Sequence, residues 1–252
     1  MAKGECVSQI GQQQIIAMFD DISKSYDTAN RILSMGLDVS WRKKACNFAL
    51  QALGQKEVYV VDVASGTGDM IVHWQNVAES MNVSLRRICG IDPSEGMLEI
   101  ARKKLPNIEL IRAEAIAMPL DSESVDILSI AYGLRNVVDT NAAFVEFARV
   151  LKEGGMLVIL EFTKNENPSI LGKMMHFYTR KILPTLGGLI SRNKQAYQYL
   201  PDSIEHFFTT QKLEQELASH GFKTLHIECA AQVSTLCVAQ KIAAPKENNE
   251  SK

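Results

Sequence analysis

A short glycine turn flanked by acidic residues is the part of the sequence best suited to binding a small ligand. The turn, Gly66-Thr67-Gly68, follows the run Val58–Val63, which is apolar except for Asp62. Because glycine lacks a Cβ, such a turn lets a ligand lie against bare backbone. The helix that starts after it directs its N-terminal amides at the same place. The pattern predicts a ligand site at the end of a strand that is buried on both faces.

Two further acids indicate which ligand the turn binds. The third glycine of the dinucleotide fingerprint is missing, because Ile71 stands in its place. Asp92 ends the next apolar run, where a carboxylate can accept both hydroxyls of a ribose. Glu114 follows the third expected strand, where it can accept the exocyclic amine of adenine. These features favour S-adenosylmethionine (SAM) over NAD, while a doubly wound domain whose glycines merely make a turn stays an alternative.

A second polar cluster, Tyr132-Gly133-Leu134-Arg135-Asn136, follows the fourth expected strand. At the end of a central strand an aromatic ring, a cation and an amide would all reach a bound ligand. On an ordinary loop, Arg135 would be an exposed charge and Asn136 a turn residue. The residues alone leave both interpretations open.

The composition excludes several classes of protein. A formal net charge of -2 over 252 residues provides no overall field that would attract nucleic acid. The five cysteines form no C-x-x-C pair, which favours reduced thiols in a cytosol-like compartment. The histidines lack ligand spacing, so we expect no metal. No signal peptide and no apolar run of roughly 20 residues is found, and we expect a cytoplasmic protein.

Alternating strands and helices predict an α/β fold around one mostly parallel sheet, with helices on both faces and right-handed crossovers. Glu153-Gly154-Gly155 should make a tight turn into the fifth strand. A short connection before the seventh strand predicts a hairpin, so that strand should run antiparallel. The expected strands span residues 58–63, 86–91, 108–112, 125–130, 156–161, 222–228 and 234–240, and the expected helices span 69–80, 94–105, 140–151 and 211–220.

The chain should form one main domain over residues 55–242, with an N-terminal helical flap over 1–54. In the flap we expect helices over 15–26, 31–35 and 41–53, with a capping break at 27–30. A helical insertion is expected near 164–206, and the polar tail 243–252 should be disordered.

The expected insertion carries an unusual mixture of side chains. Between Ile170 and Leu200 there are five cations and no acid, interleaved with apolar and methionine side chains. Such a segment could close over a hydrophobic substrate and lie peripherally against anionic lipid. An ordinary core helix with a solvated basic face would have the same composition.

Several short motifs between Ile15 and Gln240 form a recognisable set. They are Phe19-Asp-x-Ile-x-x-x-Tyr26-Asp27-x-x-Asn30, Ser34-Met-Gly36 with Trp41, Asp62-x-Ala-Ser-Gly-Thr-Gly-Asp69, Gly133-Leu-Arg-Asn136, Arg149-Val-Leu-Lys-x-Gly-Gly155 with Leu160-Glu-Phe162, and Tyr197-Gln-Tyr-Leu200 with Ser203-Ile204. Together they resemble the UbiE/MenG family of quinone C-methyltransferases. The glycine turn alone marks only class I methyltransferases, whereas Tyr-Asp-x-x-Asn and Gly-Leu-Arg-Asn are far more specific.

The resemblance implies a class I methyltransferase sheet and SAM-dependent methylation of a ring carbon on a polyprenylated quinol. The acceptor would be demethylmenaquinol, the benzoquinol of ubiquinone synthesis, or both. By matching position, SAM as co-substrate would contact Thr67, Asp92, Glu114 and Ala115, and the expected cofactor-binding set is completed by Asp62, Gly66 and Gly68.

The resemblance also implies three catalytic residues at the quinol end of the site. Arg135 would stabilise the phenolate, Asn136 would orient the second oxygen, and Tyr26 would approach from the flap. Free phenols titrate near about 10, so a neighbouring cation would favour the ionised ring.

Four questions stay open at this level: the ring type, the length of the prenyl tail, the general base and the oligomeric state, a homodimer included. The alternatives to the quinol methyltransferase are a SAM-dependent methyltransferase for another small hydrophobic acceptor, an NAD-dependent oxidoreductase, and a non-catalytic SAM-binding partner.

Overall fold

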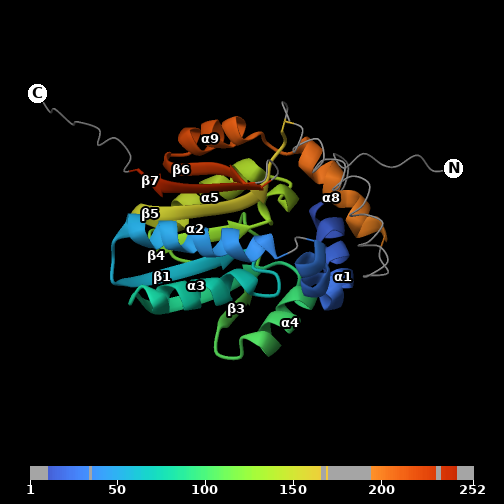
Figure 1. Cartoon of the computed structure of the whole chain (residues 1–252), viewed down its shortest axis with the longest axis horizontal. Helices are drawn as coiled ribbons and strands as arrows, with labels where there is room; N and C mark the ends of the chain where they lie inside the picture. The colour runs from blue at the N-terminus through green and yellow to red at the C-terminus, as the bar shows by residue number, and fades with distance from the viewer. Residues whose placement is uncertain (1–10, 34–35, 166–168, 170–193, 231–233, 243–252) are drawn as a thin grey trace, which may run out of the picture.

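The computed structural model describes residues 11–33, 36–165, 169, 194–230 and 234–242. Most of the basic segment expected to cover the substrate, and the polar tail from residue 243, lie outside these residues. The described chain is built around one seven-stranded sheet with the strand order β3-β2-β1-β4-β5-β7-β6 (Figure 1).

The sheet is parallel except for β7, which runs antiparallel to both of its neighbours, β5 and β6. β1 lies between β2 and β4, and six of its seven residues are buried, as its apolar run requires. The predicted α/β sheet with an antiparallel last strand is therefore confirmed. The strands are β1 Glu57–Val63, β2 Ser84–Asp92, β3 Glu109–Arg112, β4 Val125–Ala131, β5 Leu151–Phe162, β6 Phe222–Ala230 and β7 Ser234–Lys241.

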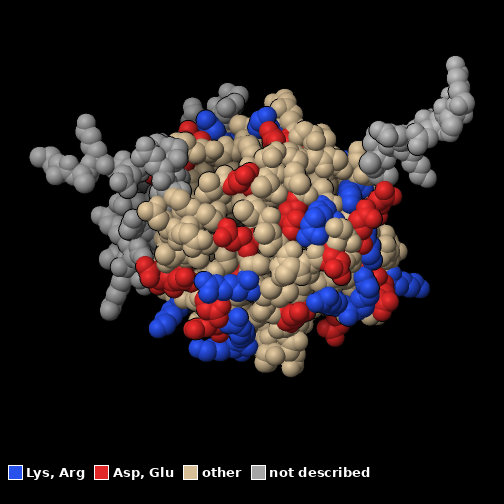
Figure 2. Space-filling view, turned by 180° about the vertical axis from the view of Figure 1, so that it is seen from behind, with Lys and Arg blue, Asp and Glu red and all other residues tan. Residues whose placement is uncertain are grey.

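Helices cover both faces of this sheet. On one face, α2 and α3 pack around the buried Trp74, and on the other face α5 and α9 pack around Phe144 and Leu217. Figure 1 shows α1, α4 and α8 together at one end of the sheet. Figure 2, the view from behind, shows cations and acids lying next to one another on that face of the molecule. The helices are α1 Gln12–Leu33, α2 Leu37–Leu53, α3 Asp69–Ser80, α4 Glu95–Lys104, the 3-10 turn η2 Leu134–Asn136, α5 Thr140–Val150, α8 Lys194–His206 and α9 Thr210–Ser219.

The flap differs from its prediction. The break expected at 27–30 is wrong, because α1 continues without interruption to Leu33, and α2 begins at Leu37 rather than at Trp41. The physical reason is the partner of Asp27. Its carboxylate accepts hydrogen bonds from the Thr67 hydroxyl and the Lys104 ammonium instead of capping a new helix.

The start of β5 also differs from its prediction. The expected turn at Gly154 and Gly155 lies inside the strand, which begins at Leu151. The pairing of β4 with β5 shifts register between Val125 and Ile127, so the two glycines belong to an irregularity in a continuous strand. Gly154 has a φ of 76°, and a Cβ on Gly155 would lie 2.9 Å from the Lys152 carbonyl oxygen, which explains why glycine occupies both positions.

Candidate active site

The glycine turn after β1 adopts a backbone that brings it close to two neighbouring elements. Ala64, Gly66 and Gly68 have positive φ angles of 51°, 54° and 84°. A Cβ on Gly68 would lie 2.5 Å from a methyl carbon of Leu105, so glycine there permits the turn to pack against the end of α4. The turn is therefore held in one conformation beside the carboxyl end of β2.

Asp92 ties this turn to the one that follows β2. Its two carboxylate oxygens accept hydrogen bonds from the backbone N–H of Gly66 at 2.7 Å and of Ser94 at 2.8 Å. Burial, with a smaller effect from the nearby carboxylate of Asp20, raises the pKa of Asp92 to about 6, although the two amide hydrogen bonds lower it. Because each carboxylate oxygen can accept more than one hydrogen bond, Asp92 keeps capacity for the hydroxyls of a ligand.

Asp62 lies deeper, beneath the turn. Its carboxylate accepts a hydrogen bond of 2.6 Å from the Ser129 hydroxyl, which in turn accepts one of 2.9 Å from the Trp74 indole N–H. Burial raises the pKa of Asp62 to about 7, although the Ser129 hydrogen bond and the charge of Arg42 both lower it. Asp62 therefore supports the floor of the site from below.

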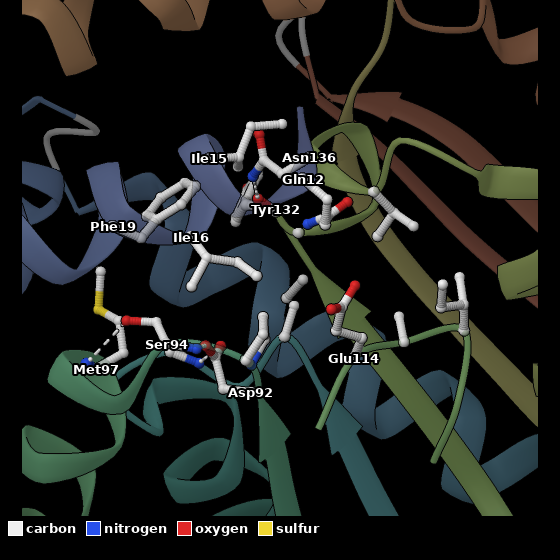
Figure 3. A pocket seen from close by; sticks show the side chains of 18 of the residues that line it. Gln12, Ile15, Ile16, Phe19, Asp92, Ser94, Met97, Glu114, Tyr132 and Asn136 are labelled. Carbon is white, nitrogen blue, oxygen red and sulfur yellow. Dashed lines mark hydrogen bonds between the residues drawn. The ribbon is translucent and has the colours of Figure 1, made fainter. Parts of the chain in front are cut away.

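A pocket opens above the carboxyl ends of the first four strands. The space within it, counted out to the open mouth, is about 700 Å³, which suits a small-molecule site. Figure 3 shows Ile15, Ile16 and Phe19 of α1 on one side of the cavity, with Asp92 and Glu114 across from them. The pocket is lined by Gln12, Ile15, Ile16, Phe19, Tyr26, Ala64, Gly66, Asp92, Pro93, Ser94, Met97, Glu114, Ala115, Ile116, Ala131, Tyr132, Gly133, Asn136 and Val137.

The amide of Asn136 is only half satisfied. Its Nδ2 donates to the Tyr132 carbonyl oxygen at 3.3 Å, while its buried Oδ1 has no hydrogen-bond partner. A buried acceptor without a donor is destabilising unless a ligand supplies the donor. Tyr26 lines the same pocket, with its ring edge-on to that of Phe19 at 6.1 Å between centroids.

Arg135 is not among the lining residues; it lies beneath the pocket in a buried ion pair. Its Nη1 is 2.5 Å from Glu161 Oε1, and its backbone N–H donates to Oε2 of the same carboxylate at 3.1 Å. The guanidinium also donates to the carbonyl oxygen of Tyr132 at 2.7 Å and to the hydroxyl of Ser203 at 3.3 Å. Burial alone would lower the pKa of Arg135, but the charge of Glu161 and smaller interactions with two tyrosines, one of them Tyr26, raise it. The charge of Arg135 is thus compensated within the protein.

Two acidic residues of helix α1 hold it over the pocket through hydrogen bonds to α4. Asp20 accepts hydrogen bonds from the Ser94 hydroxyl at 2.6 Å and from the Gly96 N–H at 2.8 Å, both at the start of α4. Further along α1, Asp27 accepts from Lys104 at the end of α4 at 3.0 Å. One helix face therefore closes the pocket, and its acidic residues attach it to both ends of α4.

In the part of the chain that the structure describes, no group of three or more His, Cys, Asp and Glu residues could hold a metal ion. Within the same residues, no helix has the length and hydropathy needed to cross a bilayer.

The comparisons with known proteins agree on one family. The model of the ubiE/COQ5 methyltransferase family matches residues 7–240. The ubiquinone/menaquinone biosynthesis C-methyltransferase UbiE of Campylobacter jejuni subsp. jejuni serotype O:6 is 49% identical over 92% of this chain and 99% of its own length. The demethylmenaquinone methyltransferase of Chlorobaculum tepidum is 37% identical over 89% of this chain and 90% of its own length.

The chain belongs to the ubiE/COQ5 methyltransferase family. It is a SAM-dependent methyltransferase, so the predicted family, enzyme class and co-substrate are confirmed. A SAM-dependent methyltransferase from Aquifex aeolicus has a TM-score of 0.53 at 16% identity, over 78% of this chain and 89% of its own. Geranyl diphosphate C-methyltransferase from Streptomyces coelicolor A3(2), in complex with Mg2+, geranyl diphosphate and S-adenosyl-L-homocysteine, has a TM-score of 0.54 at 14% identity, over 78% and 77% of the two chains. At these identities the two structures show the fold alone.

The residues of this ubiE/COQ5 family member fit the donor. Asp92 ends β2 and Glu114 follows the neighbouring strand β3. Both line one cavity, where they can hold a ribose and an adenine, and Ala64 and Gly66 leave room beside them. SAM supplies an activated methyl group when bound. The chain must hold that group, align an acceptor with it and exclude water.

The predicted site residues separate into two layers. Gly66, Asp92, Glu114, Ala115, Asn136 and Tyr26 line the pocket, whereas Asp62, Thr67, Gly68 and Arg135 do not. Thr67 donates to Asp27 of α1, and Gly68 starts α3.

Residues outside the predicted set complete the site of this family member. The sequence did not predict that Glu161 pairs with Arg135, or that Asp20 holds α1 to the start of α4. The only available signal was their presence in the motifs that carry the family resemblance. Neither pairing follows from the order of residues, because Glu161 is 26 positions from Arg135 and Asp20 is 74 positions from Ser94.

Proposed function

We propose that this enzyme methylates a ring carbon of a polyprenylated quinol, either demethylmenaquinol or the methoxy-benzoquinol precursor of ubiquinone. The observation that carries the proposal is the buried Oδ1 of Asn136, which has no hydrogen-bond partner and belongs to a residue that lines the donor pocket. A phenolic hydroxyl supplies the missing donor. The names of the relatives from Campylobacter jejuni and Chlorobaculum tepidum support a quinone substrate.

The two sides of the pocket suit such an acceptor. Asn136 and Tyr26 can contact the oxygens of a ring, while Ile15, Ile16 and Phe19 provide an apolar wall. When the ring hydroxyl donates to Asn136 Oδ1, electron density in the ring rises, and the carbon beside that oxygen becomes a better nucleophile. An acceptor with both an aromatic hydroxyl and an apolar tail uses both sides.

Arg135 has a supporting role in this proposal. Its guanidinium donates to the carbonyl oxygen of Tyr132, which also accepts from Asn136, and its charge interacts with Tyr26. Because Glu161 compensates that charge, Arg135 positions the two ring-binding residues and does not itself bind a phenolate. This assignment replaces the direct contact that the family resemblance implies.

The prenyl tail, we propose, leaves through the mouth of the pocket, and the mouth rests against a membrane surface. Ile116 lines the pocket and is 39% exposed, and Val138, next to the lining residue Val137, is 60% exposed. Replacing Val138, which does not line the pocket, with glutamate should reduce co-sedimentation with lipid vesicles and leave SAM affinity unchanged.

Methyl transfer from labelled SAM tests the proposed function directly. Demethylmenaquinol and the methoxy-benzoquinol are each supplied with a short prenyl tail, and the oxidised quinones, which lack the hydroxyl donor, serve as the matched control. At least one quinol should be methylated and neither quinone. Asn136→Ala should lower kcat/KM by on the order of 10- to 100-fold, the loss expected when a buried hydroxyl of the acceptor is left without its hydrogen-bond partner, and change SAM affinity little.

Two outcomes would contradict the proposal. If SAM binds but no polyprenylated quinol is methylated, the enzyme acts on another small hydrophobic acceptor. If Asn136→Ala lowers SAM affinity and turnover equally, the residue supports the donor site and does not contact the acceptor.

A further inference from the structure

The side chain of Arg42, on α2, is a buried cation that the proposed function does not use. The residue is 8% exposed, and its Nε has no hydrogen-bond partner. The Asp38 carboxylate is 3.6 Å from Nε, which is close enough for an ion pair but too far for a hydrogen bond. An N–H group buried in this way is costly to the folded chain unless something pairs with it.

Arg42 is not among the residues that line the pocket, but it contacts one that is. Its guanidinium carbon is 5.3 Å from the centre of the Tyr132 ring, and Tyr132 lines the pocket at the end of β4. Its charge also acts on Asp62, near the end of β1, and on Asp69, at the start of α3. These neighbours place the guanidinium near the ends of β1 and β4.

The strand order gives the direction in which the methyl donor extends. Glu114 follows β3 and Asp92 ends β2, while Ala64 follows β1 and Tyr132 follows β4. A donor whose adenine and ribose lie at the ends of β3 and β2 must extend its methionyl group across the ends of β1 and β4. That group ends in a carboxylate, which requires a cation or N–H donors when it leaves water.

The other nearby cations already have close acidic partners. Arg31 lies 3.2 Å from Asp69, and the Lys104 ammonium lies 2.6 Å from the other oxygen of the same carboxylate. The side chains of Arg31 and Lys104 are 46% and 31% exposed. Among these three cations, only Arg42 combines a buried side chain with an Nε–H that has no partner.

We propose that Arg42 binds the carboxylate of the donor's methionyl group. The Nε–H and the positive charge of Arg42 pair with that carboxylate, and Tyr132 holds the guanidinium in place. This inference rests on the proposed function only through its donor site and is independent of the acceptor.

Isothermal titration with two donors that differ by one group tests the proposal. Decarboxylated SAM keeps the adenosine, the sulfonium and the amine of SAM but lacks the carboxylate. The unmodified chain should prefer SAM over decarboxylated SAM by on the order of 10- to 100-fold, the value of a charge-assisted hydrogen bond. Arg42→Met should remove most of this preference, chiefly by weakening SAM, and change the affinity for decarboxylated SAM by less than about threefold.

Two control variants separate binding from folding. Arg31→Met removes a cation that also pairs with Asp38 and should leave the preference intact. Arg42→Lys keeps the charge without the planar fork and should retain part of the preference. Equal weakening of both donors by Arg42→Met would overturn the proposal, because it would show only a structural role.

Equal affinity of the unmodified chain for both donors would also overturn the proposal, and this measurement requires no variant. Since no acceptor is present in the titration, a failure to methylate quinols would refute the proposed function and leave this inference standing.

Discussion

Acidification should weaken donor binding through Asp92. Burial raises the pKa of this carboxyl to about 6, and the carboxylate of Asp20, which reaches it from α1, adds to the rise. When protonated, Asp92 has one O–H donor in place of acceptor capacity and loses its charge, so it binds the ribose hydroxyls less well. The affinity should therefore be high above the pKa and fall as the pH drops through it.

The magnitude follows from the pKa of Asp92. If only the ionised form of Asp92 binds, the apparent dissociation constant equals that of the fully ionised protein multiplied by a factor. This factor is 1 + 10^(pKa − pH), where the pKa is that of Asp92. With a pKa of about 6, the factor is close to 1 at pH 7.5, about 2 at pH 6 and about 11 at pH 5.

Isothermal titration with S-adenosylhomocysteine between pH 5 and pH 7.5 measures this factor. Asp92→Asn should bind weakly at every pH and show no slope. Asp20→Asn should shift the midpoint to lower pH, because it removes the neighbouring negative charge and keeps an acceptor for the start of α4. A wild-type affinity that is flat over this range, or a slope that persists in Asp92→Asn, would refute the reasoning.

Three further predictions concern the supports of the site. Glu161→Gln should destabilise the fold by about 3–5 kcal/mol in chemical denaturation, because it leaves the buried charge of Arg135 uncompensated; a loss below about 1 kcal/mol would contradict the ion pair. Gly133→Ala should reduce S-adenosylhomocysteine affinity and lower the unfolding temperature, since its Cβ would lie 2.4 Å from that of Ala64 across the pocket floor; unchanged binding would argue against this contact. Asp62 is buried with a pKa of about 7, so its contribution to folding is present at pH 4 and lost as the pH rises through 7. Asp62→Asn should abolish that loss. The free energy of unfolding of the variant minus that of the unmodified chain should therefore increase by up to about 4 kcal/mol between pH 4 and pH 8.

The sequence alone predicts the framework of this enzyme well. The buried run before the glycine turn predicts a strand covered on both faces, and the alternation that follows it predicts a sheet with crossovers. Since the carboxyl ends of parallel strands meet at one edge, Asp92, Glu114 and Asn136 were expected together there, and the structure places all three in one pocket. These features depend on local patterns, which is why they can be read without coordinates.

What only the tertiary structure decided is which charged groups face one another. The sequence predicts a capping break at Asp27, yet α1 continues through this residue. Its carboxylate accepts hydrogen bonds from Thr67 and Lys104, which lie elsewhere in the chain. The family resemblance predicts that Arg135 stabilises a phenolate, and the structure shows that its guanidinium is paired with Glu161 of the adjacent strand β5. Such pairings join residues tens of positions apart, and their energies depend on burial and distance, which no local pattern encodes.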